Sequence, residues 1–175
     1  MLISLSEIMT TKDKVVQINA PIDMERFDYE GESYDFAQKE PVNPTITNLG
    51  DRRVMIEGGT NISLTLYCGR CLKEMIYPMN ISIQKEVDFN LTEEERAEGL
   101  DDTNFIIGYN LDVDTLIYDE ILIDFPMKLL CREDCKGLCK KCGTNLNENT
   151  CDCDTTVLDP RMSVIRDIFN NFKEV

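Results

Sequence analysis

The sequence predicts an α+β fold: a mostly antiparallel β-sheet packed by a helix, then a small C-terminal Cys-rich zinc-binding module and a terminal helix. Three observations lead to this prediction. Residues 41–90 have the composition of strands, and residues 112–124 carry apolar side chains at helical spacing. Six of the eight cysteines fall within residues 131–153. We expect a mainly β domain over 1–126 and the zinc module with its terminal helix over 127–175.

The strands are expected from alternation and turn residues. Apolar and polar residues alternate over 62–66, which places Ile62, Leu64 and Leu66 on one sheet face. The pairs Gly50-Asp51 and Gly58-Gly59 are typical of turns, so we expect a meander of about four strands over 41–90.

The N-terminal forty residues are mixed. Short strands are expected at 1–8 and 15–20, and one more at 105–110. The acidic and aromatic stretch 24–36 is predicted to be irregular. Residues 91–102 are strongly acidic, which predicts a solvated loop or, as the alternative, a docking surface for a basic partner.

The helix over 112–124 has clear ends. Asp112 is a suitable N-cap, Asp114 suits the positive N-terminal end, and Pro126 ends the helix. One face is apolar and is expected to cover the sheet; it consists of Val113, Leu116, Ile117 and Ile121.

A second helix is expected at the C-terminus, with Asp159 as N-cap and Pro160 at its first position. It either packs on the domain or is offered to a partner. Its apolar face consists of Val164, Ile165, Ile168, Phe169 and Phe172.

Charge and composition exclude several functions. The net charge is −15 and the pI is 4.3, which argues against a general nucleic-acid binder and against binding to an anionic membrane. With no histidine, neither a Ser-His-Asp nor a Cys-His catalytic arrangement can form. No secretory signal or membrane span is evident, so we expect a cytoplasmic protein. In that compartment, cysteines are more often metal ligands or redox groups than disulfides.

The strongest motif is Cys139-Lys-Lys-Cys142-Gly143, followed after eight residues by Cys151-Asp-Cys153. Two thiolates two residues apart can chelate one ion, and the glycine lets the backbone turn beneath it. These four cysteines predict a tetrahedral zinc site with a closed shell, which is structural because no ligand position is left for water.

The other four cysteines are Cys68, Cys71, Cys131 and Cys135. They form a possible second zinc site, so one zinc ion is expected and two are possible. The alternative is that these four are reduced, partly buried thiols. A disulfide scaffold is disfavoured by the absence of a secretion signal. A thioredoxin-like site is disfavoured because neither Cys-x-x-Cys opens a helix after a strand.

A local excess of positive charge surrounds the cysteines on this acidic chain. It either offsets the negative charge of a zinc–thiolate centre or contacts RNA phosphates or an acidic partner. The basic residues are Lys128, Arg132, Lys136, Lys140 and Lys141.

Four stretches together resemble the YceD-like family of large ribosomal RNA subunit accumulation proteins, in its cysteine-rich Gram-positive and clostridial form. They are TLYCGRCLKEM, DEILIDFPMKLLC, CREDCKGLCKKCGTNLNENTCDC and DPRMSVIRDI. The resemblance implies a cytoplasmic, non-enzymatic ribosome-biogenesis factor that supports accumulation or processing of 23S rRNA. It implies pre-ribosomal RNA or ribosomal proteins as partners, and no small-molecule substrate.

Two other functions are kept as alternatives. One is a thiol- and zinc-based redox-responsive regulator, in which oxidation expels the metal. The weaker one is a Mg²⁺-dependent nuclease; its acidic residues cluster in an expected loop without fixed octahedral geometry.

Overall fold

The computed structural model describes residues 1–91 and 103–153. They form two compact units. The first consists of Met1–Tyr67 and Glu74–Leu129, and the second of Cys68–Lys73 with the chain from Leu130 onward. The division into a mainly β domain over 1–126 and a zinc module with a terminal helix over 127–175 stays a prediction. No helix among the described residues is long and apolar enough to cross a membrane.

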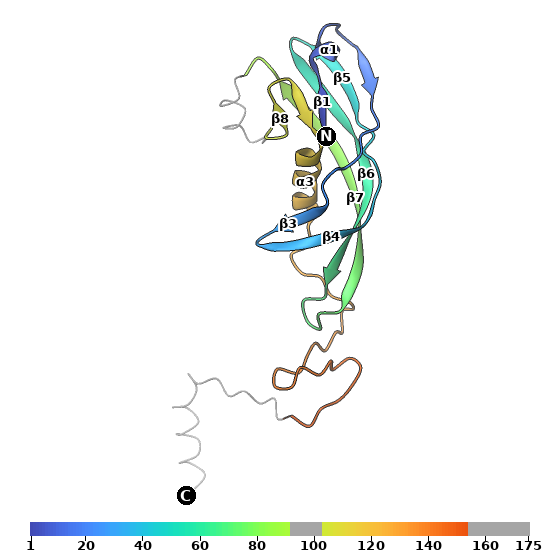
Figure 1. Cartoon of the computed structure of the whole chain (residues 1–175), viewed down its shortest axis with the longest axis vertical. Helices are drawn as coiled ribbons and strands as arrows, with labels where there is room; N and C mark the ends of the chain where they lie inside the picture. The colour runs from blue at the N-terminus through green and yellow to red at the C-terminus, as the bar shows by residue number, and fades with distance from the viewer. Residues whose placement is uncertain (92–102, 154–175) are drawn as a thin grey trace, which may run out of the picture. The chain divides into compact units, whose positions relative to one another are not determined.

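The longest strands in the described part of the first unit are β6 (Arg53–Tyr67) and β7 (Glu74–Asp88) (Figure 1). They pair antiparallel along their whole length, from Arg53 opposite Asp88 to Tyr67 opposite Glu74. Because side chains alternate along a strand, this register places one continuous apolar face toward the core. The predicted face of Ile62, Leu64 and Leu66 is confirmed, since all three are buried.

The other edge of β6 pairs with two strands in turn. Strand β5 (Thr45–Gly50) pairs with its first half and β4 (Glu32–Lys39) with its second. Outer positions are taken by β2 (Val15–Gln17) on β5 and β3 (Arg26–Tyr29) on β4. The predicted mostly antiparallel sheet packed by a helix is confirmed, although 45–88 holds three strands rather than about four.

The prediction of irregular structure over 24–36 is wrong, because β3 and β4 form a tight hairpin there. Its two turn residues, Glu30 and Gly31, both have positive φ, of 51° and 85°. Such a turn matches the twist of the paired strands. The aromatic residues of the stretch are part of the core: Phe27 is fully buried and its ring lies 5.2 Å from that of Tyr118.

The predicted turn at Gly58-Gly59 is also wrong, because β6 runs straight through both glycines. Glycine is needed at both positions because a neighbouring backbone lies too close to β6 to leave room for a Cβ atom. A Cβ on Gly58 would lie 2.9 Å from the carbonyl oxygen of Asn43, and one on Gly59 would lie 2.5 Å from that of Ile81. The turn predicted at Gly50-Asp51 is confirmed, with positive φ at both residues.

A small second sheet closes one end of this unit. It consists of β1 (Leu2–Ser4), β9 (Asn110–Asp112) and β8 (Ile106–Ile107), in the order β1-β9-β8. A single-turn helix, α1 (Ser6–Met9), follows β1 and buries Ile8. The short strands expected near 1–8, 15–20 and 105–110 are therefore present, the last as two strands.

Helix α3 (Val113–Asp124) lies beside the long ribbon of β6 and β7 (Figure 1). The side chain of Asp112 accepts a hydrogen bond from the backbone N–H of Asp114, which confirms the predicted N-cap. The helix ends at Asp124, and its C-cap residue Phe125 is extended because a residue before proline avoids helical angles. The predicted apolar face is buried in full: Val113, Leu116, Ile117 and Ile121.

One ion pair joins this helix to the sheet. The Lys85 ammonium on β7 lies 2.9 Å from the carboxylate of Glu120, which is largely buried on the same helix face as Ile117 and Ile121. Removing Lys85 would leave the Glu120 carboxylate largely buried without its ion-pair partner, so the pair helps to hold this face of α3 against the sheet. The expected helix over 159–172 and residues 92–102 of the acidic loop lie outside the described residues.

We predict that Gly59→Ala lowers the free energy of unfolding by about 1–3 kcal/mol, since the new methyl group forces β6 away from β7. Urea denaturation of the two proteins would measure the difference. Ser63→Ala, on the same face of the same strand, is the control and should change stability by less than about 0.5 kcal/mol. Equal stability of wild type and Gly59→Ala would contradict the close-approach explanation.

Candidate metal centre

The second unit is built around two short loops of the same backbone design. In the first, which joins β6 to β7 in the chain, the N–H of Leu72 donates to the carbonyl of Cys68 at 2.9 Å. The N–H of Cys68 in turn donates to the carbonyl of Lys73 at 2.9 Å. Leu72 adopts a left-handed conformation, with φ of 58°. These bonds fold Cys68 and Cys71 onto the same side of the loop.

The second loop repeats this pattern at Cys139–Thr144. The N–H of Gly143 donates to the carbonyl of Cys139 at 2.9 Å, and the N–H of Cys139 donates to that of Thr144 at 2.8 Å. Gly143 takes the left-handed position, with φ of 74°, without the strain that a side chain adds. The turn inferred from the glycine in this motif is confirmed. Both Cys-x-x-Cys motifs therefore present two sulfur atoms in the same way.

The eight sulfur atoms gather into two groups of four, within each of which all lie within 4.8 Å of one another. In chain order, we call them the first group (Cys68, Cys71, Cys131 and Cys135) and the second group (Cys139, Cys142, Cys151 and Cys153). The first group is the set that the sequence predicts as the possible second zinc site. The two groups are the two sets into which the sequence reasoning divided the cysteines. All eight are free thiols.

Sulfur spacing in the first group fits a tetrahedral ion. The Sγ atoms of Cys68 and Cys135 are 3.8 Å apart, and those of Cys71 and Cys131 are 3.6 Å apart. Four sulfurs each about 2.3 Å from one zinc ion lie about 3.8 Å from one another, whereas disulfide sulfurs lie about 2.05 Å apart. The donor set therefore fits a zinc ion, which would supply positive charge to closely spaced thiolates.

The environment of the first group shifts the pKa values of its cysteines in opposite directions. Burial alone would raise the pKa of Cys68, but backbone N–H groups aimed at its sulfur lower it to about 6; they belong to Cys71, Arg70 and Cys131. Burial raises the pKa of Cys131 to about 12, and the neighbouring sulfurs of Cys135 and Cys71 add to this effect. Without a metal, one thiol ionises at the expense of another.

In the second group, too, the pKa of one cysteine is lowered and that of another is raised, and the side chains are more exposed than in the first group. The hydroxyl and N–H of Thr144 lower the pKa of Cys142 to about 6, and the two side chains lie 3.1 Å apart. The sulfur of Cys142, followed by burial, raises the pKa of Cys153 to about 12. Backbone N–H groups of Cys142 and Lys141 lower the pKa of Cys139.

The five basic residues do not share one environment. Lys128 belongs to the first compact unit and the other four to the second. Arg132 forms an ion pair with Asp134 at 3.3 Å and donates to Asn147 at 3.0 Å. Lys136, Lys140 and Lys141 are exposed, and within the described part of the chain their ammonium groups have no hydrogen-bond or ion-pair partner.

Sequence reasoning missed two residues that hold the cysteine loops together. The guanidinium of Arg70 donates to the carbonyl of Cys135 at 2.9 Å. The backbone carbonyl of Arg70 accepts from the N–H of Leu138 at 3.2 Å. The side-chain amide of Asn147 donates to the sulfur of Cys135 at 3.3 Å. Both lie next to motif residues or inside the gap between them, but no spacing rule assigns such residues to a distant cysteine.

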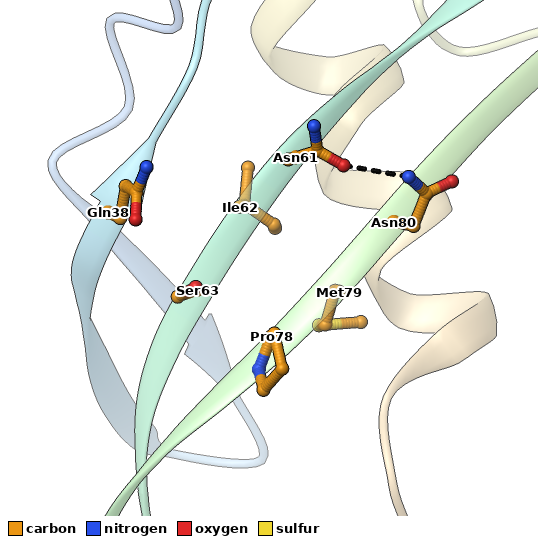
Figure 2. Close-up of a pocket in the computed structure, with 7 residues that line it drawn as sticks. All are labelled: Gln38, Asn61, Ile62, Ser63, Pro78, Met79 and Asn80. Atoms are coloured by element: carbon orange, nitrogen blue, oxygen red, sulfur yellow. Dashed lines mark hydrogen bonds between the residues drawn. The ribbon is translucent and has the colours of Figure 1, made fainter.

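A separate hollow lies on the outer face of the sheet in the first unit (Figure 2). It has a volume of about 370 Å³, and a 2.7 Å hydrogen bond from Asn80 to Asn61 bridges β6 and β7 at its edge. Its polar lining consists of amides and a hydroxyl, without a carboxylate, lysine or cysteine. These groups are poorly suited to general acid–base catalysis.

We predict that Cys142 is the first cysteine to react with iodoacetamide in the reduced, chelated protein at pH 7. It is exposed and its pKa of about 6 makes it mostly thiolate, whereas Cys153, with a pKa of about 12, stays protonated. The rate at Cys142 should fall as the pH drops below about 6. Peptide mass spectrometry at early times would measure both sites; equal initial rates would contradict the prediction.

Comparison with known proteins adds a family match. The family described as "Large ribosomal RNA subunit accumulation protein YceD" matches residues 56–169, a stretch that contains all eight cysteines. No solved structure matches the chain.

Several curated proteins are similar over shorter stretches. An uncharacterised protein of Mycobacterium leprae (strain TN) is 24% identical over 124 residues, which cover 59% of this chain and 57% of that protein. One of Mycobacterium bovis is 23% identical over 93 residues, 53% of this chain and 45% of the relative. The chloroplastic "Large ribosomal RNA subunit accumulation protein YCED homolog 1" of Arabidopsis thaliana is 40% identical over 43 residues, 25% of this chain and 13% of the relative. The chain thus matches 57% or less of the length of each of these relatives.

Proposed function

Because this chain belongs to the YceD family of large ribosomal RNA subunit accumulation proteins, we propose that it is a non-enzymatic ribosome-biogenesis factor. In this proposal it supports accumulation or processing of large-subunit rRNA by binding pre-ribosomal RNA or a ribosomal protein. Family membership supports the role in rRNA accumulation. The mode of binding is inferred from the second compact unit.

Zinc is the proposed cofactor, with one ion in each group of four cysteines. The observation that carries this assignment is the sulfur spacing of 3.6 and 3.8 Å in the first group. Four thiolates close the shell of each ion, so zinc would be structural. Few apolar residues lie within 131–153, and the metal would supply the folding free energy that a hydrophobic core supplies elsewhere.

Direct RNA contact is proposed for the lysines of the second Cys-x-x-Cys loop. The N–H of Lys141 is directed at the sulfur of Cys139, while the side chains of Lys140 and Lys141 remain exposed and unpaired within the described residues. Unpaired ammonium groups on a rigid loop suit phosphate contacts. Contact through a basic ribosomal protein at the acidic segment 91–102 is the other route.

A redox-responsive regulator is a second candidate, supported by the pKa of about 6 at Cys68. Its low pKa favours thiolate chemistry, but Cys68 is fully buried and lies in a turn between two strands. Reactive thiolates are usually partly exposed. The geometry therefore fits a structural metal ligand better than a redox centre.

We predict two zinc ions per chain in protein purified anaerobically. Cys71→Ser and Cys142→Ser should each reduce the content to about one, because each removes a ligand from a different group. Elemental analysis with free-thiol counting before and after chelation would measure this. A wild-type protein without zinc would contradict the metal assignment and favour the redox function.

We predict that the double variant Lys140→Glu, Lys141→Glu weakens binding to a large-subunit rRNA fragment. Loss of two phosphate contacts should reduce the slope of log Kd against log salt by about 2. Fluorescence anisotropy over a salt series would measure it. Lys12→Glu with Lys14→Glu, in the first unit, changes the net charge equally and serves as control. An unchanged slope would point to contact through a ribosomal protein.

A further inference from the structure

Asn147 belongs to the segment 143–150, which separates the two cysteine pairs of the second group, yet its side chain reaches the first group. Its amide Nδ2 donates to the sulfur of Cys135 at 3.3 Å. Its Oδ1 accepts from the N–H of Lys136 at 2.8 Å and from the guanidinium of Arg132 at 3.0 Å. One half-buried amide thus binds a sulfur of the first group and the backbone beside it.

The backbone of this segment runs antiparallel to 136–139, the stretch that joins the two groups. Leu138 and Asn145 form a β-bridge, and the N–H of Leu146 donates to the carbonyl of Gly137 at 2.9 Å. The Oδ1 of Asn145 accepts from both the N–H and the amide Nδ2 of Asn147, at 3.0 and 2.9 Å. The orientation of the Asn147 amide therefore depends on the fold of the segment.

That fold in turn depends on the second group, because the segment is tied at one end to Cys142 and at the other to Cys151. A metal held by these cysteines keeps both ends in place. Release of that metal would free the ends and, with them, the amide at Cys135.

The amide has a direct effect on the first group. The N–H of the Asn147 side chain is directed at the sulfur of Cys135, one of the four sulfur atoms of that group. A zinc ion with four thiolates carries a net negative charge, and N–H···S bonds draw electron density from the sulfur. They make a bound thiolate harder to protonate or alkylate.

We propose that Asn147 is a positioning residue that couples the two cysteine groups, so that metal bound in the second group slows metal loss and thiolate attack in the first. This inference rests on the proposed zinc assignment. Because coupling between bound states is reciprocal at equilibrium, metal in the first group also raises the affinity of the second.

The test is a double-mutant cycle on the zinc-loaded full chain. The measured quantity is the rate at which Cys131 and Cys135 become alkylated in the presence of a chelator, read by peptide mass spectrometry. Asn147→Asp keeps the size and the acceptor oxygen but replaces the donor with a negative charge. It should accelerate alkylation by about 10–100-fold.

Cys142→Ser, which disables the second group, should also accelerate alkylation of Cys131 and Cys135. Added to Asn147→Asp it should give little further acceleration, because the route through the amide is already lost. Asn149→Asp is the matched control: it makes the same change in the same segment, at an exposed side chain that forms no hydrogen bond with the described residues. It should leave the rates within about twofold of wild type.

A spectroscopic measurement guards against a variant that merely unfolds. With Co²⁺ in place of zinc, Asn147→Asp should shift the sulfur-to-metal charge-transfer band, while Asn149→Asp should not. Asn145→Ala loosens the amide without adding charge and should change the rate in the same direction but less.

Wild-type rates in Asn147→Asp, or full additivity with Cys142→Ser, would overturn the coupling while leaving the zinc assignment intact. Wild-type cysteines that react at once without chelator would overturn both.

Discussion

The fifteen-residue pairing of β6 with β7 determines where most other parts of the first unit lie. Because the register is continuous, every second side chain of both strands faces the same core, and a shift of one residue would expose that core entirely. The free edge of β6 and the inner face of this ribbon then receive other elements of the unit. Strands β5 and β4 take consecutive halves of the free edge of β6, and α3 is held against β7 by apolar packing and the Lys85–Glu120 ion pair.

The loop between β6 and β7 carries the first cysteine pair, Cys68 and Cys71. Strands β6 and β7 are separated in the chain only by Cys68–Lys73, and the hydrogen bonds of that loop leave two sulfur atoms on one side. Cys131 and Cys135, about sixty residues later in the chain, supply the other two sulfur atoms of a group that could hold a metal ion. Closing so long a loop costs conformational entropy, which zinc–sulfur bonds can offset.

Four thiols whose sulfur atoms lie within 4.8 Å of one another cannot all ionise without a cation, because the resulting thiolates would repel one another. Backbone N–H groups favour charge on some sulfurs, and crowding disfavours it on others, with pKa values near 6 and near 12 in each group. Arg70 and Asn147 add side-chain donors between the loops. Polar interactions thus hold together the described part of this unit, which has few apolar residues, and its two groups of four sulfur atoms could each hold a metal ion.

Features that depend on neighbouring residues were determined by the sequence alone: the Asp112 cap, the apolar face of α3, the alternation over 62–66 and the turn of the Cys139–Gly143 motif. Features that depend on distant residues were decided by the tertiary structure. Gly58 and Gly59 read as a turn, but the backbones of Asn43 and Ile81 require glycine inside a strand. Residues 24–36 read as irregular, but packing on Tyr118 and Phe125 makes them a hairpin. No motif includes Asn147, and only the folded chain brings its amide to the sulfur of Cys135, because no local pattern records a contact between separate segments.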